Sequence, residues 1–176
     1  LQPDRDDARC NSYTLAQALS AAIELKARVI NLSLSGPPDA LLAALATQAV
    51  RAGIIIVGSQ SDGPSFPGSL EHVLSVGRSE DARVASGVLQ APGREVLTLA
   101  PGGRYDFYSG SSISTGEISG VTALMIALRS GLDARQAQAL LSKATETTES
   151  PAGPVRSVNA CMALAALTGA SGCEKK

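Results

Sequence analysis

The sequence predicts a three-layer α/β fold, in which a mainly parallel sheet is covered by helices on both faces. Two helix-like and two strand-like segments alternate within residues 14–58, an order that is typical of α/β proteins. The second of these strands, "IIIVG" at residues 54–58, is continuously apolar, as expected for a parallel strand buried on both faces. Helical periodicity then returns in the last third of the chain.

The first helix and the first strand are predicted over residues 14–27 and 28–34. Apolar residues recur at positions 15, 19, 22 and 23, which places them on one helical face. Asn11 or Ser12 is the expected cap, because a short polar side chain can accept a hydrogen bond from a backbone N–H of the first turn. The segment "RVINLSL" follows, and its β-branched residues favour a strand.

The next unit repeats this order of helix and strand. Asp39 is the expected N-cap of a helix over residues 39–52, and Gly53 follows the end of that helix. A strand is predicted over residues 53–58 and another over residues 73–77, within "HVLSVG". Further strand patterns, "ARVASGVL" and "REVLTLA", are separated by glycine and proline, which mark turns.

Three helices are predicted for the last third of the chain, over residues 113–129, 134–144 and 158–167. In the first of them, apolar residues recur at i, i+3, i+4 and i+7. Asp133 and Gln136 have the spacing of a capping box at the start of the second. A mainly helical end therefore follows a middle region rich in strands and turns.

Length and composition favour a single globular domain. A chain of 176 residues can bury about 70% of its extended surface, and we assign residues 1–170 to the domain and 171–176 to a polar tail. Hydrophobic residues make up 44% of the chain and aromatic residues only 3%, so the core should be aliphatic. The net charge of −1 offers no basic surface for nucleic acid or anionic lipid. No apolar run reaches the roughly 18 residues that span a bilayer.

Three cysteines leave the redox compartment open. Cys10, Cys161 and Cys173 lack the spacing of metal ligands. One pair would form a disulfide in an oxidising compartment and leave one thiol free, whereas buried free thiols are an equally good interpretation. The charged stretch "LQPDRDDARC" has no signal-peptide pattern.

The segment "YSGSSISTGEISG", residues 108–120, places two adjacent serines at the start of a predicted helix. The first turn of a helix has unpaired N–H groups and the positive end of the helix dipole, which can stabilise an oxyanion formed beside a serine hydroxyl. Serine is also a good N-cap residue, so Ser111 or Ser112 could serve only as a cap. From these residues alone, the cap is the simpler interpretation.

Five segments in this order resemble the subtilisin-like serine proteases: "VINLSLSGP", "AVRAGIIIVGSQSDG", "FPGSLEHVLSVG", "APGREVLTLAPGGRYDFYSGSSIS" and "ISGVTALMIAL". The resemblance extends over about residues 13–167. The family's serine box, Gly-Thr-Ser-x-Ala-x-Pro-x-x-x-Gly, corresponds to residues 110–120. The resemblance therefore implies that Ser112 is the catalytic nucleophile and that its own N–H contributes to the oxyanion hole. Ser111 then occupies the position that the family usually fills with threonine.

Two further sites are implied by the resemblance. Ser33, Leu34, Ser35 and Gly36 match the family's Ser-Leu-Gly-Gly strand, whose backbone pairs with an extended peptide substrate. Ser35 replaces a glycine, and its side chain would narrow the approach of the substrate's P1 residue. Ser61 stands where the family has the asparagine that donates to the oxyanion, and a serine hydroxyl is a shorter donor.

The chain departs from the family pattern in its general base and within the serine box. The family's Asp and His lie far upstream of the serine, and this sequence begins about where the family's second helix–strand unit begins, so we expect the N-terminal part of the domain to be absent. The only histidine, His72, corresponds to the entry of a strand without a catalytic role, and we expect it to serve a surface or packing role. Gly116 and Glu117 replace the family's Pro-His pair, and glycine weakens a helix by about 1 kcal/mol relative to alanine.

These features support two functions. The first is a serine endopeptidase that cleaves peptides through an acyl-enzyme as part of a complete domain, the isolated chain being inactive. The second is a degenerate, non-catalytic homologue that binds peptides or proteins. A nucleotide-binding module is disfavoured, because no Gly-x-Gly-x-x-Gly or Gly-Lys-[Ser/Thr] loop follows a strand.

The first function implies a peptide or protein substrate and no cofactor, with a secreted or periplasmic location by family analogy. Calcium is a ligand that family analogy allows, but neither a calcium site nor any other metal site can be identified in the sequence. Apolar faces left bare by a partial domain would be covered by the N-terminal half or by a second copy of the chain.

Overall fold

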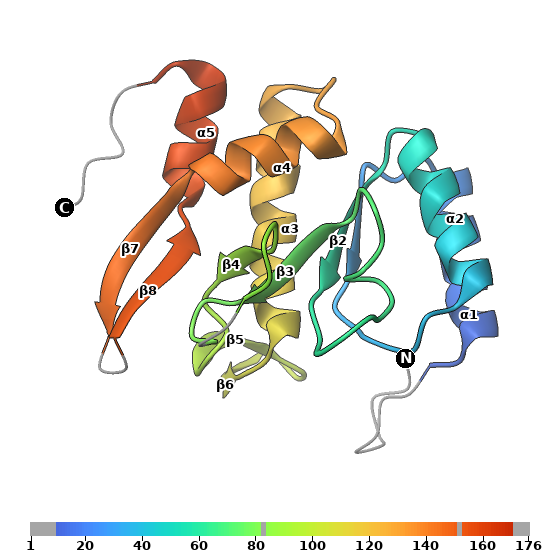
Figure 1. The fold of residues 1–176 in the computed structure, drawn as a ribbon, viewed down its shortest axis with the longest axis horizontal. Coiled ribbons are helices and arrows are strands. Elements are labelled where there is room, and N and C mark those ends of the chain that lie inside the picture. Colours follow the sequence, from blue (N-terminus) through green and yellow to red (C-terminus); the bar gives the residue numbers. More distant parts are fainter. Residues whose placement is uncertain (1–9, 82–83, 151–152, 171–176) are drawn as a thin grey trace.

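A four-stranded parallel sheet forms the centre of the structure (Figure 1), which is a computed structural model that describes residues 10–81, 84–150 and 153–170. The strands lie in the order β1-β2-β3-β4, and every neighbouring pair is parallel. Their bounds are β1 Val29–Leu32, β2 Ile55–Ser59, β3 Leu74–Arg78 and β4 Leu89–Ala91. The predicted three-layer α/β architecture is confirmed, because helices pack on both faces of this sheet.

Helices α1, Ser12–Glu24, and α2, Ala40–Arg51, lie side by side on one face (Figure 1). Their N-caps are those the sequence predicts: Asn11 accepts a hydrogen bond from the backbone N–H of Thr14, and Asp39 accepts two. The core on this face joins both helices to the sheet through Leu19, Leu42, Ala46, Ile30, Leu32, Ile54, Ile56 and Phe66.

The opposite face is covered by α3, Ser111–Leu128, together with α4, Ala134–Lys143, and α5, Ala160–Thr168. Helix α4 begins with the predicted capping box of Asp133 and Gln136. The core on this face is aliphatic, as the composition predicts, and includes Ile55, Val57, Leu74, Val76, Ile118, Met125 and Leu141. Helix α3 contacts β1, β2, β3 and β4, so its first turn has a fixed position relative to the ends of the strands.

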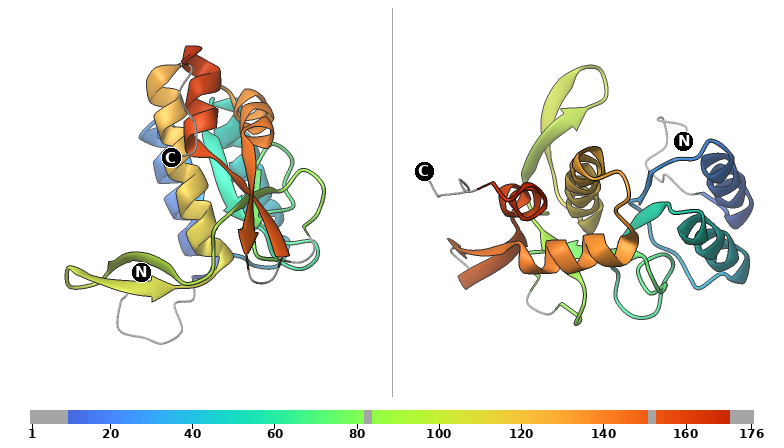
Figure 2. Two further views of the ribbon diagram at one scale, coloured as in Figure 1. Left: turned by 90° about the vertical axis from the view of Figure 1, so that its left-hand side faces the viewer. Right: turned by 90° about the horizontal axis from the view of Figure 1, so that it is seen from above.

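Two antiparallel hairpins lie outside this sheet, β5–β6 (Val96–Ala100 and Arg104–Tyr108) and β7–β8 (Thr145–Ser150 and Gly153–Val158). Figure 2 shows β5–β6 standing away from the layers. Large side chains on one face of this hairpin are mostly exposed: Leu97, Leu99, Tyr105 and Phe107.

The five predicted helices and three predicted sheet strands are present, with ends that differ by a few residues. The difference that matters lies at the predicted helix 113–129, because α3 already begins at Ser111. Both serines therefore lie inside the first turn, Gly110 is the N-cap, and the interpretation of Ser111 or Ser112 as the cap is wrong. The sequence did not predict β6, β7 or β8, and the predicted tail, 171–176, lies outside the described residues.

By length and composition alone, α3 is long and apolar enough to cross a membrane, with a mean hydropathy of 1.2. The sequence analysis had not identified it as such a segment. In the structure, α3 packs along the sheet, and Ile118, Met125 and Ile126 are buried there. It is therefore placed as a core helix in this fold.

Candidate active site

The carboxyl edge of the sheet brings together the segments that carry the predicted site residues. Ser33 follows the last residue of β1, Ser61 follows β2, and Ser112 lies in the first turn of α3. The Ser33 hydroxyl donates a hydrogen bond of 2.8 Å to the backbone carbonyl of Ser112. Ligands of open parallel sheets bind at this edge, because the connecting loops and helix N-termini converge there.

Ser112 is exposed at the start of α3. The N-cap, Gly110, has a φ of 152°, a conformation that favours glycine, and it offers no side chain to cap the helix. The N–H groups of the first turn and the positive end of the helix dipole are thus close to the Ser112 hydroxyl. An exposed hydroxyl beside such donors is suited to attack a carbonyl and to stabilise the resulting oxyanion.

A small polar network fixes the serine turn to β1. The Asn31 amide nitrogen, Nδ2, donates to the Ser33 hydroxyl oxygen at 3.1 Å, which leaves the Ser33 proton for the Ser112 carbonyl. The hydroxyl of Ser119, two turns into α3, lies 3.1 Å from Asn31 Oδ1 and 2.8 Å from the carbonyl oxygen of Thr115, so these two acceptors share its proton. Sequence analysis missed Asn31 and Ser119, because the two are 88 residues apart and no local pattern links them.

A buried pair of hydroxyls fixes the same turn to β2. Ser59 Oγ and Thr115 Oγ1 are 2.9 Å apart, and Thr115 donates to the carbonyl of Ser111 at 2.7 Å. Since a hydroxyl has one proton, Ser59 is the donor in the pair. A threonine in an apolar helix often bonds to the carbonyl four residues earlier, a signal that could have indicated this residue from the sequence.

Ser61, the predicted oxyanion donor, is half-buried, and its hydroxyl donates to Ser65 Oγ at 2.6 Å. The proton of this hydroxyl is therefore engaged within its own loop. An asparagine amide has two protons and a longer reach, so the replacement changes what this position can offer to an oxyanion.

The segment predicted to bind substrate is partly paired already. Gly36 exchanges both of its backbone hydrogen bonds with Phe66, each at 3.0 Å. Leu34 packs against the core formed by α1 and α2, and Ser35 is exposed. An extended peptide would therefore have to pair with the residues that precede Gly36.

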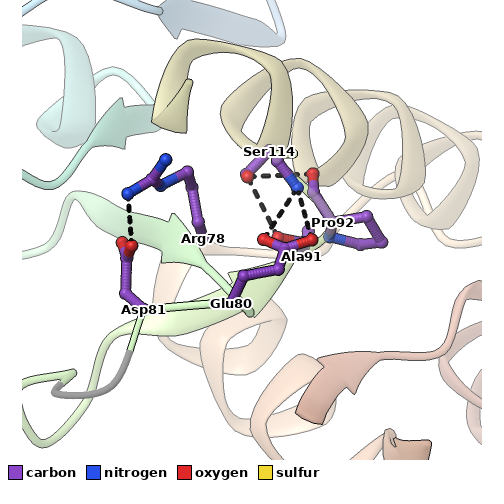
Figure 3. Close-up of polar contacts among 7 residues, drawn as sticks. Arg78, Glu80, Asp81, Ala91, Pro92 and Ser114 are labelled. Carbon is purple, nitrogen blue, oxygen red and sulfur yellow. Dashed lines mark hydrogen bonds and ion pairs between the residues drawn. The ribbon is translucent and has the colours of Figure 1, made fainter. Parts of the chain in front are cut away.

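A second segment, residues 91–93, packs under the serine turn (Figure 3). The hydroxyl of Ser114, a fully buried residue, lies 3.0 Å from the carbonyl oxygens of both Ala91 and Pro92. Glu80 accepts a hydrogen bond from the N–H of Gly93. The sequence analysis identified neither Ser114 nor Glu80 as part of the site.

Glu117 introduces a second carboxyl group near this segment. Burial of the carboxyl group raises the pKa of Glu117, and repulsion by the Glu80 carboxylate raises it further, although much of the residue's surface is exposed. Ionised Glu117 is repelled by the Glu80 carboxylate, whereas a histidine, as the family has here, would not be repelled by it.

His72 lies at the opposite edge of the sheet. It precedes β3, whereas Ser112 meets the residue that follows β1, and all four strands are parallel. Its imidazole pairs with Glu71 at 3.3 Å and lines a cavity of about 670 Å³ beside the C-terminus of α2 and the N-terminus of α4. His72 therefore cannot act as the base for Ser112, in agreement with the expectation of a surface or packing role.

Metal ligands do not gather in the described part of the chain. Within residues 10–81, 84–150 and 153–170, no group of three or more His, Cys, Asp or Glu side chains is placed to hold a metal ion. The residues that the structure describes thus do not fit a calcium site built from carboxylates.

The family model for the subtilase family matches residues 3–160. The chain is 33% identical over 129 residues to the intracellular serine protease of Paenibacillus polymyxa and 30% identical over 129 residues to the major intracellular serine protease of Bacillus subtilis (strain 168). Each match covers 63% of this chain and 40% of the relative, so the chain spans less than half of the length of these proteins.

Among solved structures, the fold is similar to that of the prenylagaramide maturation protease PagA. The TM-score is 0.74 with 21% sequence identity, over 95% of this chain and 71% of that one. A cold-adapted subtilisin-like serine proteinase gives a TM-score of 0.72 with 23% identity, over 79% of this chain and 56% of that one. Since the family match extends over most of the sequence, the chain belongs to the subtilase family of serine peptidases.

Proposed function

We propose that this chain carries the nucleophile of a subtilisin-like serine endopeptidase domain. The observation that carries the proposal is the position of Ser112, which is exposed in the first turn of α3 at the carboxyl edge of the sheet. The hydrogen bond from Ser33 and the buried Ser59–Thr115 pair hold this turn in place. A rigid turn supports the proposal, because covalent catalysis requires a nucleophile fixed relative to the reacting carbonyl.

In the proposed reaction, Ser112 Oγ bonds to the carbonyl carbon of a peptide while a base takes the hydroxyl proton. The N–H groups of the α3 first turn stabilise the oxyanion. The C–N bond then breaks, the base gives its proton to the leaving amine, and water hydrolyses the acyl-enzyme by the same two steps.

We propose that the base and its orienting carboxylate come from residues outside this sequence. The only histidine of the chain is His72, which lies at the other edge of the sheet. Without a base the Ser112 hydroxyl stays protonated at neutral pH and is a poor nucleophile. The isolated chain is therefore inactive, and peptide hydrolysis belongs to the domain that contains it.

The proposal is tested on the protein as its gene encodes it, by peptide hydrolysis and by reaction with a fluorophosphonate probe. Ser112 should carry the adduct, and Ser112→Ala should abolish both signals. Ser111→Ala is the matched control in the same helical turn and should keep activity of the same order. A folded protein that neither hydrolyses peptides nor reacts with the probe would contradict the proposal.

That negative result would favour the second function, a non-catalytic homologue that binds peptides. One observation points toward it: the Ser61 hydroxyl donates to Ser65 and has no proton left for an oxyanion. Binding of an extended peptide by the inactive protein, measured by calorimetry and lost on blocking the segment from Ser33 to Ser35, would identify this function.

Exposed apolar surfaces on this chain support contact with a further protein segment that would cover them. Within the described residues β1 has no strand on its outer side, and Leu97, Leu99, Leu124 and Leu128 are each more than half exposed. We propose that the remainder of a subtilisin-like domain covers these surfaces, with a second copy of the chain as the alternative. Sedimentation of the isolated chain should show self-association; a monomer that binds no hydrophobic dye would contradict this.

A secreted or periplasmic location stays a proposal, because two of the related proteases are named as intracellular. Its support is that Cys161 is disulfide-bonded while Cys10 is an exposed free thiol, and disulfides persist in oxidising compartments. Cell fractionation of the source organism would test it, with recovery in the cytosolic fraction as the contradicting result.

A further inference from the structure

We infer that Glu80 is a positioning residue for the turn that carries Ser112, acting through the backbone of Gly93 and Gly110. The inference deepens the proposed function and rests on it for its catalytic readout, whereas its structural readout is independent of catalysis. Glu80 touches neither Ser112 nor a substrate, so its effect must pass through the intervening backbone.

The first link is the contact between Glu80 and Gly93. The N–H of Gly93 lies 3.2 Å from Oε1 and 3.1 Å from Oε2, so both carboxylate oxygens share this donor. Hydrogen bonds that involve a charged group are about twice as strong as neutral ones. Figure 3 shows the Glu80 side chain reaching toward the segment that holds Ala91 and Pro92.

Arg78, two residues before Glu80, forms its ion pair with a different carboxylate. The guanidinium of Arg78 pairs with Asp81 at 2.5 Å, and this pairing, with a smaller contribution from the Glu80 charge, raises the pKa of Arg78. In Figure 3, Arg78 points toward Asp81 while Glu80 points toward the segment beneath Ser114.

The second link joins Gly93 to the start of α3. The carbonyl of Gly93 accepts a hydrogen bond of 2.8 Å from the N–H of Gly110. Gly110 is the N-cap of α3, and its own carbonyl accepts from the N–H of Ile113 at 3.0 Å. A displacement of Gly93 therefore moves the residues that directly precede and follow Ser111 and Ser112.

The third observation is that Gly93 has no room to move sideways. A Cβ at this position would lie 2.5 Å from Arg78 Cγ and 2.5 Å from Ser114 Oγ. The Ser114 hydroxyl in turn bonds to the carbonyls of Ala91 and Pro92. Since Ser114 lies two residues after Ser112, the segment 91–93 contacts the serine turn from both of its ends.

The repulsion between Glu80 and Glu117 agrees with this arrangement. The raised pKa of Glu117 has burial as its first cause and the Glu80 carboxylate as its second. Glu80 thus lies close enough to the first turns of α3 for its charge to affect another side chain of that helix.

Two variants of Glu80 separate a positioning role from a general effect on folding. Glu80→Leu removes the acceptor, whereas Glu80→Gln keeps one oxygen that can accept from Gly93. Glu71→Leu, the same substitution at the opposite edge of the sheet, is the control. All are measured on the protein as its gene encodes it, by amide hydrogen exchange at single residues and by the rate of fluorophosphonate labelling.

In Glu80→Leu, exchange at the amides of Gly93 and Gly110 should rise about tenfold or more, while the amides of β2 keep their protection. The labelling rate at Ser112 should fall by about tenfold, and Glu80→Gln should restore both values to within about threefold of the parent protein. The control should change neither quantity.

Three outcomes would overturn the inference: unchanged exchange at Gly110 in Glu80→Leu, equal loss of protection across the whole sheet, or failure of Glu80→Gln to restore the parent values. If the parent protein is never labelled, the proposed function fails, and the exchange at Gly93 and Gly110 still decides whether Glu80 holds the turn.

Discussion

The two edges of the central sheet differ in what they offer to catalysis. The carboxyl edge holds Ser112 on a turn fixed to β1 and β2 by the Ser33 and Ser59 contacts. The amino edge holds His72 and a cavity of about 670 Å³, but none of the predicted nucleophile or substrate-binding residues. A parallel strand of five residues is roughly 16 Å long, so a proton cannot pass directly between these edges.

This difference shows that position in the fold, and not the presence of both residue types, decides whether a nucleophile can be activated. The Ser112 turn is supported from three sides, by β1, by β2 and by the segment 91–93. Such support is what a covalent catalyst requires, and His72, the one histidine of this sequence, does not lie at this edge. These contacts support the proposal that this chain supplies the nucleophile, with the base contributed by residues outside this sequence.

The largest expected effect concerns the donor at Ser61. Ser61→Asn should raise the turnover of the encoded protease by about 10–10³-fold, and the upper value comes from a subtilisin. The asparagine amide could donate to the oxyanion, whereas the serine hydroxyl that it replaces donates to Ser65. Ser61→Ala should lower turnover by less than about threefold, since that proton is already engaged. Steady-state hydrolysis of a peptide ester measures both.

A fall of about 10²–10³-fold in the turnover of Ser61→Ala, the loss expected when an oxyanion donor is removed, would contradict the assignment of the Ser61 proton to Ser65. It would mean that the Ser61 hydroxyl turns toward the substrate during the reaction and then donates to the oxyanion.

Two glycine substitutions test which parts of the serine turn are tightly packed. Gly93→Ala should lower the free energy of unfolding by about 1–3 kcal/mol, because its Cβ would overlap Arg78 and Ser114. Gly116→Ala should raise it by about 1 kcal/mol, since its Cβ meets no atom within 4 Å and alanine favours the helix. Urea denaturation of both variants checks the opposite signs.

Stabilisation by both variants would show that the segment 91–93 yields to an added methyl group, and destabilisation by both would show that Gly116 does not tolerate one. In either case Gly93, under the serine turn, and Gly116, on the surface of α3, would no longer differ in how tightly they are packed.

Much of the fold was predictable because its signals are local. Asn11, Asp39 and Asp133 cap their helices three residues or fewer from the N–H groups they bind, and such pairs can be read from spacing. The continuous apolar run in β2 likewise indicated a buried strand. The position of Ser112 followed from the resemblance to a known serine box.

The rest depends on partners that are distant in the sequence. Glu80 meets Gly93 thirteen residues later, and Asn31 meets Ser119 across 88 residues, so no periodicity indicates either contact. Strand β6 was missed although its sequence, RYDFY, alternates charged and aromatic residues, because five residues are too few for such a pattern to stand out beside a glycine turn.

The smallest expected effect concerns Glu117. Because its pKa is raised in the folded protein, stability falls as pH rises from the ordinary pKa of a glutamate through the raised value. Glu117→Gln removes this dependence, so the variant should be more stable than the parent at pH 8, by less than about 1 kcal/mol, and equally stable below the ordinary pKa. Denaturation at the two pH values measures the gain, whereas the gain of Gly116→Ala should be independent of pH.

The most direct test of the central claim is fluorophosphonate labelling of the folded 176-residue chain beside the protein as its gene encodes it, with the adduct located by mass spectrometry. The account predicts an adduct on Ser112 in the encoded protein and none on the isolated chain, because the base lies outside this sequence. Rapid labelling of the isolated chain that is lost in Ser112→Ala would contradict it. Loss of that labelling in His72→Ala as well would show that the two edges of the sheet act together after all.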